Sequence, residues 1–182
     1  NGAQGMEAQA MIMYLGSKER LLLAILGIAR RFPNHRHVLD LFSGASHVGH
    51  GFKKAGYRVT ANDHNAYAHA IACCYVEADR ERVLDDAQRL VRELNALPGR
   101  AGYFTETFCA RSRFFQPKNG ARIDAIREAI ARKSLDPILE SVLLTSLMEA
   151  ANRVDSTCGL QMAYLKKWAP RSNNDLELRM PD

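Results

Sequence analysis

LDLFSGASHVG, residues 39–49, sets a short apolar, β-rich run directly against a loop of small residues. We predict a strand over 37–42 that enters this loop and a helix over 47–55 that leaves it. Gly56 then ends the helix, and a second strand follows over 57–63. Two strands joined by a helix lie parallel in a βαβ unit, so the sequence predicts an α/β fold.

The composition is that of a folded domain with a basic charge. The chain has 182 residues, of which 47% are hydrophobic, and this is enough for one core with a small appended lobe. Its formal net charge of +5 favours a polyanionic partner such as nucleic acid without specifying one.

Helical periodicity dominates the rest of the chain. Leu22, Ile25 and Leu26 recur at helical spacing, which predicts a buried helix over 18–31 with Ser17 as its cap. Further helices are expected over residues 65–75, 79–97, 121–133 and 137–152, the last of them capped by Asp136. No convincing strand occurs between residues 102 and 168, so this region is expected to be a helical lobe attached to the α/β unit.

The cysteines, the hydropathy and the histidines indicate the compartment of the protein and exclude some classes of partner. The four cysteines show no C-x-x-C spacing, which fits a reduced, cytoplasmic protein. The apolar run over 21–29 is too short to span a bilayer, so no membrane partner is expected. The six histidines form no H-E-x-x-H motif and join no cysteine cluster, so we expect no metal.

The loop within the opening stretch carries the first sign of chemistry. Gly44 to Gly49 follows the fingerprint G-x-G-x-x-G, but Ser46 stands where the middle glycine lets a pyrophosphate approach the backbone. A dinucleotide is therefore disfavoured. Asp63 comes nineteen residues after Gly44, at the predicted end of the second strand, where a carboxylate can accept hydrogen bonds from a ribose. An adenosine-containing ligand fits both observations.

Three short segments together carry a family resemblance. YLGSK at 14–18, DLFSGASHVG at 40–49 and AND at 61–63 resemble the cofactor-binding elements of the DNA adenine methyltransferases. The segments 114–130 and 143–168 resemble the helical target-recognition region of the same family. The resemblance covers nearly all of residues 14–172, and it rests on the order and spacing of the segments.

The resemblance implies a Rossmann-like S-adenosylmethionine-dependent methyltransferase fold with a helical insertion lobe. It implies three parts: the cofactor-binding part at 1–98, the target-recognition lobe at 99–172 and the start of a return to the catalytic sheet at 173–182. It also implies S-adenosylmethionine as methyl donor and the exocyclic amine of adenine as acceptor. The residues that match the family's cofactor site are Tyr14, Gly16, Lys18, Asp40, Phe42, Gly44 and Asp63.

Double-stranded DNA is the partner that the resemblance implies. The region after residue 100 is rich in arginine and lysine, and phosphate contacts supply much of the affinity for a duplex. Four polar positions match the family's recognition lobe and are our candidates for DNA contacts: Asn119, Arg122, Asn152 and Arg153. Asparagine can read adenine and arginine can read guanine in the major groove.

The sequence departs from the family in two places. Ser46 replaces a glycine usual in the family's loop. The Asp/Asn-Pro-Pro-Tyr segment that holds the flipped base is also missing, since none of the six prolines adjoins another. We therefore assign no catalytic residue and expect an amino-terminal fragment of a longer enzyme, which binds the cofactor and transfers nothing.

Two alternative functions stay open at this point. A cytosine-ring methyltransferase is one, because DLFSG followed by GFKKAGYRV also resembles that family, although the usual Pro-Cys dipeptide is missing. A non-catalytic module that binds a cofactor or DNA is the other, since Ser46 and the missing segment both allow it. Neither the DNA sequence read, nor a role in restriction–modification or regulation, nor the oligomeric state follows from these motifs.

Overall fold

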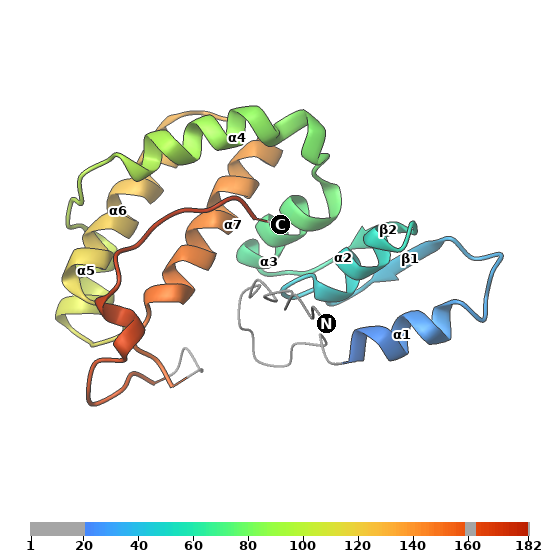
Figure 1. The fold of residues 1–182 in the computed structure, drawn as a ribbon, viewed down its shortest axis with the longest axis horizontal. Coiled ribbons are helices and arrows are strands. Elements are labelled where there is room, and N and C mark those ends of the chain that lie inside the picture. Colours follow the sequence, from blue (N-terminus) through green and yellow to red (C-terminus); the bar gives the residue numbers. More distant parts are fainter. Residues whose placement is uncertain (1–20, 159–162, 182) are drawn as a thin grey trace, which may run out of the picture.

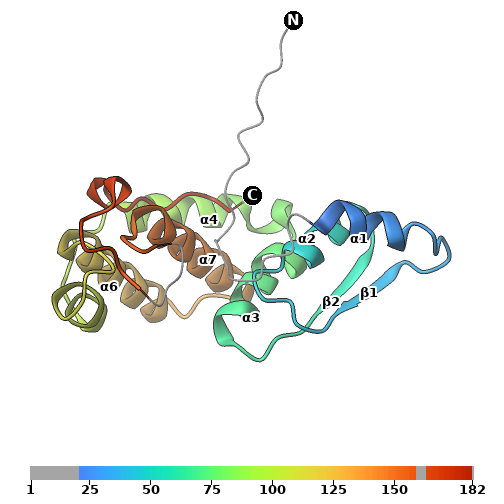
Figure 2. The ribbon, with the colours of Figure 1, turned by 90° about the horizontal axis from the view of Figure 1, so that it is seen from below.

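A computed structural model describes residues 21–158 and 163–181 (Figure 1). The elements of the α/β unit are α1 (Leu22–Ala29), β1 (His37–Asp40), α2 (His47–Lys54), β2 (Arg58–Ala61) and α3 (Ala66–Ala72). Those that follow are η2 (Cys73–Glu77), α4 (Arg80–Asn95), α5 (Tyr103–Thr105), η3 (Glu106–Ala110), α6 (Pro117–Arg132), α7 (Pro137–Val154) and η4 (Pro170–Asn173). Figures 1 and 2 show the unit and the helical lobe at opposite ends of an elongated molecule.

The βαβ prediction is confirmed. Strands β1 and β2 pair in parallel, with Val38 opposite Val59 and Asp40 opposite Ala61. Helix α2 joins them and ends where Gly56 takes a φ of +82°, a left-handed value that suits glycine. In the described part of the chain these two strands form the whole sheet, and with the surrounding helices they make an α/β fold.

The helix predicted over 18–31 is present as α1, but the prediction that it is buried is wrong. Helix α1 has no buried residue, and Leu23 and Ile28 are 84% and 58% exposed. The helix is apolar on every side, but one face alone meets α2, where Leu22 lies so close to Gly51 that a Cβ there would collide with it. Helical spacing predicted the helix and could not predict how much of it is covered. None of the described helices is long and apolar enough to cross a membrane.

The lobe is built around α4, α6 and α7. The helix predicted over 79–97 is confirmed as α4, and its residues Ala87, Leu90, Val91 and Leu94 are buried. Asp136 caps α7 as expected, because its carboxylate accepts from the N–H groups of Ile138 and Leu139 at 3.0 and 3.4 Å. The larger members of the shared core are Leu90, Leu94, Ile123, Ile126, Ile130, Leu143, Leu147, Leu176 and Leu178.

Asp124 fixes the start of the aromatic segment that precedes α6. Its buried carboxylate accepts hydrogen bonds from the N–H groups of Gly102, Phe104 and Thr105 at 2.8 to 2.9 Å. The Thr105 hydroxyl donates to it as well, at 2.7 Å. These bonds hold the pKa of Asp124 below its usual value, against the opposing effect of burial. A single carboxylate therefore satisfies the free N–H groups at the start of α5.

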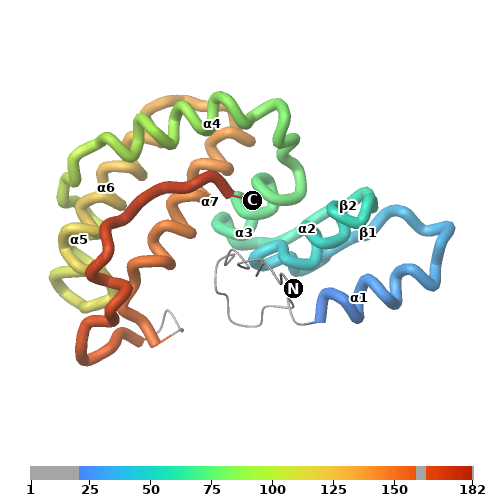
Figure 3. The backbone as a smooth tube through the Cα atoms, in the orientation of Figure 1, coloured from blue at the N-terminus to red at the C-terminus, as the bar shows by residue number. Residues whose placement is uncertain are grey.

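The segment after η4, residues 174–181, was expected to begin a return to the sheet. It runs extended across the lobe without strand pairing among the described residues, and it leads from the far end of the lobe toward α3 (Figures 1 and 3). Asn95 makes two hydrogen bonds to the backbone of Leu178, at 2.8 and 3.0 Å. Leu176 and Leu178 are buried in the lobe core, so this terminal strap is an integral part of the lobe.

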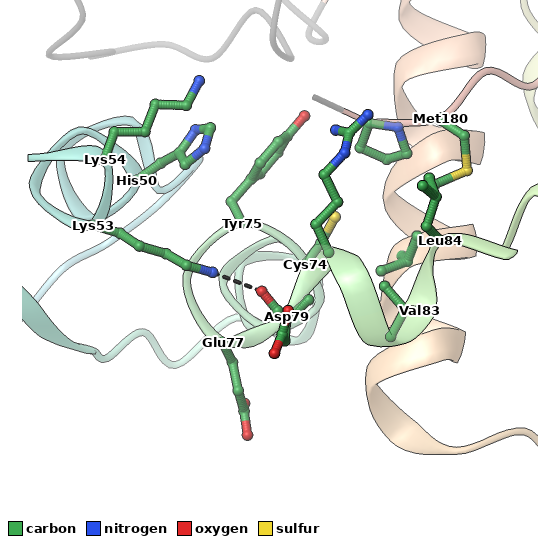
Figure 4. A pocket seen from close by; sticks show the side chains of 14 residues that line it. His50, Lys53, Lys54, Cys74, Tyr75, Glu77, Asp79, Val83, Leu84 and Met180 are labelled. Carbon is green, nitrogen blue, oxygen red and sulfur yellow. Dashed lines mark hydrogen bonds between the residues drawn. The ribbon is translucent and has the colours of Figure 1, made fainter. Parts of the chain in front are cut away.

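The unit and the lobe are joined where α3 and η2 pack against α7, while α2 packs on η2. The Tyr75 hydroxyl donates to the carboxylate of Glu149, and both side chains are buried. The ring of His50 lies 4.9 Å from that of Tyr75 (Figure 4). Lys53 donates from Nζ to the carbonyl oxygen of Ala78 at 2.7 Å, and burial lowers its pKa. A cavity of about 810 Å³ lies beside these contacts.

Candidate functional site

The loop after β1 is held in one conformation by its own backbone. Gly44 and Ser46 both take left-handed φ values, +50° and +57°. The N–H of Ser46 donates to the carbonyl of Ser43 at 2.7 Å, and the N–H of Ser43 donates to the carbonyl of Asn62 at 3.0 Å. The loop that follows β1 is thereby tied to the end of β2, where ligands bind in open α/β sheets.

Asp63 completes the link between the two strand ends. Its Oδ2 accepts from the N–H of Gly44 at 2.9 Å, and its Oδ1 accepts from the backbone and the side chain of Asn65 at 3.0 and 3.2 Å. The bonds from Asn65 and Gly44 lower the pKa of Asp63, so the carboxylate is charged at neutral pH. Since a carboxylate oxygen has two lone pairs, Oδ2 can accept a further hydrogen bond from a ligand hydroxyl.

Two buried hydroxyls in this loop are functional candidates that sequence reasoning missed. Ser43 and Ser46 are 8% and 0% exposed, and their Oγ atoms have no hydrogen-bond partner in the described part of the chain. A buried hydroxyl without a partner costs free energy, which a polar ligand group can recover. The signal in the sequence was the composition of the loop, since two serines stand within four residues of a tight strand-to-helix turn.

The remaining cofactor candidates divide into described and undescribed residues. Asp40 ends β1 and stands beside the loop, at the same sheet edge as Asp63. The Phe42 ring is 89% exposed, so the described residues leave it almost bare. Tyr14, Gly16 and Lys18 lie outside the described residues. The structure therefore brings Asp40, Gly44 and Asp63 together.

Two of the four DNA candidates are bonded inside the lobe. Asn119 is 1% exposed, donates to the carbonyls of Ser172 and Asn174 and accepts from the N–H of Leu176. Arg122 donates to the carbonyl of Asn95, the last residue of α4, and to the carbonyl of Leu97, two residues beyond the helix. In this conformation both side chains bind the protein's own backbone. Sequence position alone did not reveal which way they point.

The other two candidates lie near the end of α7. Arg153 donates to the carbonyl of Glu177 in the strap at 2.9 Å, and burial followed by the charge of Arg179 lowers its pKa. Asn152 lines a second cavity, of about 450 Å³, between the loop after β1 and the lobe. Asn119 and Arg122 line another cavity, of about 770 Å³, together with Asp175 and Glu177 of the strap.

Cysteines and metal ligands add nothing to this site. Burial raises the pKa of Cys74 to about 12 and that of Cys109 to about 11, so neither is a thiolate nucleophile near neutral pH. Within residues 21–158 and 163–181, no group of three or more histidine, cysteine or acidic side chains is arranged to hold a metal ion.

Comparison with known proteins gives one family. Residues 14–182 match the model of the D12 class N6 adenine-specific DNA methyltransferases. The type II methyltransferase M.NlaIII of Neisseria lactamica is 30% identical over 165 residues, which cover 84% of this chain and 49% of the relative. The type II methyltransferase M.FokI of Planomicrobium okeanokoites is 29% identical over 188 residues, covering 93% of this chain and 29% of the relative.

Modification methylase StsI of Streptococcus sanguinis is a further relative, 27% identical over 182 residues that cover 91% of this chain and 28% of the relative. No solved structure matches the chain. The chain therefore spans about half the length of M.NlaIII and less than a third of the other two relatives.

Proposed function

Because the chain belongs to the D12 class N6 adenine-specific DNA methyltransferases, we propose that it is the cofactor-binding and DNA-recognition part of an enzyme that methylates the exocyclic amine of adenine in DNA. The parallel βαβ unit is then the first part of a Rossmann-like sheet, and α4 to α7 form the insertion lobe. The adenine specificity of the family argues against the cytosine-ring alternative. We propose a type II modification role, which matches the names of the relatives, with double-stranded DNA as partner and the cytoplasm as compartment.

S-adenosylmethionine is the cofactor that these residues fit, and when bound it supplies the methyl group. Asp63 would accept from the ribose hydroxyls, and the backbone of Gly44 would border the ligand. The hydroxyls of Ser43 and Ser46 are available as hydrogen-bond donors to a polar group of the ligand, and a carboxylate is the obvious acceptor. The exposed ring of Phe42 offers a cation–π contact to a sulfonium.

The bond between Gly44 and Asp63 is the observation that carries this proposal. It joins the loops that follow the two parallel strands, and it presents a charged carboxylate at the edge of the sheet where an adenosine ligand binds. The loop is held by bonds of the protein alone. Binding of a ligand therefore costs little free energy for ordering the loop, and such preorganisation raises affinity.

Titration of the 182-residue chain with S-adenosylhomocysteine in a calorimeter tests the site. We expect binding by the wild type and at least about a tenfold weaker Kd for Asp63→Ala, because its ribose acceptor and its bond to Gly44 are both lost. Asp85→Ala is the matched control, since Asp85 is an exposed carboxylate on α4. Absence of binding by the wild type, or equal affinity of Asp63→Ala, would refute the proposal.

Methyl transfer itself needs residues that are not among these 182. The chain holds no Asp/Asn-Pro-Pro-Tyr segment, so no side chain of this sequence is assigned to hold the amine of the target base. We expect the chain to bind the cofactor and to transfer no labelled methyl group to DNA. Transfer above the level of a no-protein control would contradict this assignment.

A further inference from the structure

Helix α7 has two buried faces of different chemistry, one toward the lobe and one toward the unit. The residues that it gives to the core of the lobe are Leu143, Leu147, Ala150 and Val154. Its buried polar residues Ser141, Thr145 and Glu149 recur at intervals of four, so they share another face of the helix. This polar face packs against α3 and η2, and we call the contact the seam. Burial is uncommon for a glutamate, so the composition of the seam is unusual.

Two residues of this row bond to the unit. The Thr145 hydroxyl donates to the carbonyl of Ala70 in α3 at 3.4 Å. One turn further along α7, the carboxylate of Glu149 accepts from the hydroxyl of Tyr75 in η2. The Tyr75 side chain is itself held in place, since it is 4% exposed and its ring lies against that of His50 (Figure 4). Such bonds form at one relative position of two helices and break when the helices slide.

Glu149 also connects the seam to the end of α7. Arg153 follows it by four residues; burial lowers the pKa of Arg153, and the nearby charge of Glu149 opposes this effect. Arg153 donates to the carbonyl of Glu177, so this arginine ties the strap to α7. Its neighbour Asn152 lines the cavity between the loop after β1 and the lobe. The orientation of α7 at the seam therefore decides where these two DNA candidates lie.

On the other side of the seam, one helical segment leads back to the cofactor loop. Asp63 and Asn65, which are bonded to each other, precede α3, and α3 runs into η2 without a break at Cys73. Tyr75 lies about 15 Å along this segment from Asn65, at 1.5 Å per helical residue. The segment η2 is a π-helical turn, a rare form that is frequent at functional sites. The seam thus lies between the cofactor edge and the recognition end of the lobe.

The buried bond between Tyr75 and Glu149 gains the protein little stability. Burial removes the hydration of the carboxylate, and hydrogen bonds return roughly what is lost, so an apolar pair of similar size is often as stable or more stable. A buried polar contact supplies a defined geometry instead, since its two groups must meet at bonding distance and angle. The chemistry of the seam therefore suits the fixing of an orientation.

We propose that Tyr75 and Glu149 are positioning residues, which fix the orientation of the helical lobe on the unit and thereby the place of bound DNA relative to the cofactor. The proposal rests on the proposed function for its DNA and its cofactor, while the orientation itself is measured without either. Neither residue belongs to the loop after β1 or lines the cavity of about 450 Å³, so both act through the arrangement of the two parts.

The distance between two spin labels, one on each part, reports this orientation. Lys54→Cys on α2 and Arg92→Cys on α4 supply exposed thiols, and Cys158→Ser removes the exposed native one. We expect one narrow distance distribution for the chain that is otherwise wild type. Tyr75→Phe combined with Glu149→Leu replaces the bond by apolar groups of similar shape, and this double variant should lose the single narrow distribution.

Tyr75→Phe alone, which removes a single hydroxyl, should also widen the distribution, and it decides the matter if the double variant does not fold. Glu149→Gln keeps a carbonyl acceptor for the Tyr75 hydroxyl and should keep the distribution narrow. Tyr57→Phe is the matched control, because this buried tyrosine packs on Phe52 inside the unit, with ring centroids 5.1 Å apart. Ile126→Val lowers stability from within the lobe core and should leave the distribution narrow.

DNA binding supplies a second readout, which a merely structural contact would not move. S-adenosylhomocysteine should tighten the binding of a labelled duplex by the wild type about fivefold or more, the lower end of usual coupling between two sites. The double variant, or Tyr75→Phe in its place, should bind S-adenosylhomocysteine like the wild type and lose this factor.

A narrow distribution that is unchanged in Tyr75→Phe and in the double variant overturns the inference. An equally wide distribution in Ile126→Val also overturns it, because the orientation would then follow stability alone. The same holds if S-adenosylhomocysteine binds but leaves duplex affinity unchanged in the wild type, or if the variants keep the wild-type factor. If the wild type binds no S-adenosylhomocysteine, the proposed cofactor site fails, and the label distances still decide whether Tyr75 and Glu149 orient the lobe.

Discussion

Replacing Asn119 by alanine separates a structural role from a role in binding DNA. Asn119 lies inside the lobe and holds the terminal strap through three hydrogen bonds, to Ser172, Asn174 and Leu176 at 3.3, 2.9 and 3.0 Å. Alanine removes all three bonds and leaves the N–H of Leu176 buried without a partner. The side chain is 1% exposed, so solvent cannot replace the lost bonds without opening the lobe.

The size of the effect follows from these bonds. Each neutral hydrogen bond contributes about 1 kcal/mol net, and a buried donor left unpaired costs somewhat more, so Asn119→Ala should lower the free energy of unfolding by about 3 kcal/mol. For a domain of this size that corresponds to a Tm lower by roughly 6 to 12 °C. Asn152→Ala removes the same chemical group from a side chain without such bonds and should lower the free energy by less than about 1 kcal/mol.

Urea unfolding followed by circular dichroism measures the stability of both variants. Fluorescence anisotropy with a labelled duplex, at one fixed salt concentration and at a temperature where both variants are folded, measures DNA affinity. We expect Asn119→Ala to lose stability and keep its affinity. The reasoning is refuted if Asn119→Ala unfolds like the wild type while its affinity for the duplex falls, since the amide would then face DNA in solution.

Ser46→Gly should raise the free energy of unfolding by up to about 1 kcal/mol, because glycine takes the left-handed φ of +57° without strain; thermal unfolding measures it, and a lower Tm would contradict the reading. Asp124 has a lowered pKa when folded, so its stabilising effect is full above the unfolded value near 3.8 and fades as pH falls through the folded pKa. Unfolding midpoints between pH 5 and pH 3 should therefore fall more steeply for the wild type than for Asp124→Asn, and parallel curves would exclude this role. Iodoacetamide at neutral pH should modify the exposed Cys158 well before the half-buried Cys74 and the buried Cys109, because burial raises the pKa of both thiols; peptide mass spectrometry checks this, and equal rates would contradict it.

Local sequence patterns predicted the parts of the fold that depend on residues close together in the sequence. The cap at Asp136, the turn at Gly56 and the helix predicted over 79–97 all depend on residues close together in the sequence, so the sequence was sufficient to predict them. The cofactor edge was predictable for a related reason. Parallel strands joined by a helix must end at the same edge, and this brought Asp63 to Gly44.

The spacing of residues in the sequence could not predict which way a side chain points or how much of a helix is buried. Asn119 and Arg122 are polar residues on a helix, and only the folded lobe shows that they bind the strap and the end of α4. The α1 helix has the composition of a core helix, yet the described residues cover one side of it. The unpartnered hydroxyls of Ser43 and Ser46 also depend on three-dimensional burial, which no sequence period encodes.

The strap has a consequence for synthesis on the ribosome. Asn95 and Leu178 are 83 positions apart, yet they are directly bonded, and Leu178 belongs to the same core as Leu94. At about 5 to 20 residues per second, α4 emerges roughly 4 to 17 s before the segment that covers it. During that interval the apolar side chains that Leu176 and Leu178 cover stay exposed, so the growing chain is open to chaperones and to wrong contacts until residues 174–181 leave the tunnel.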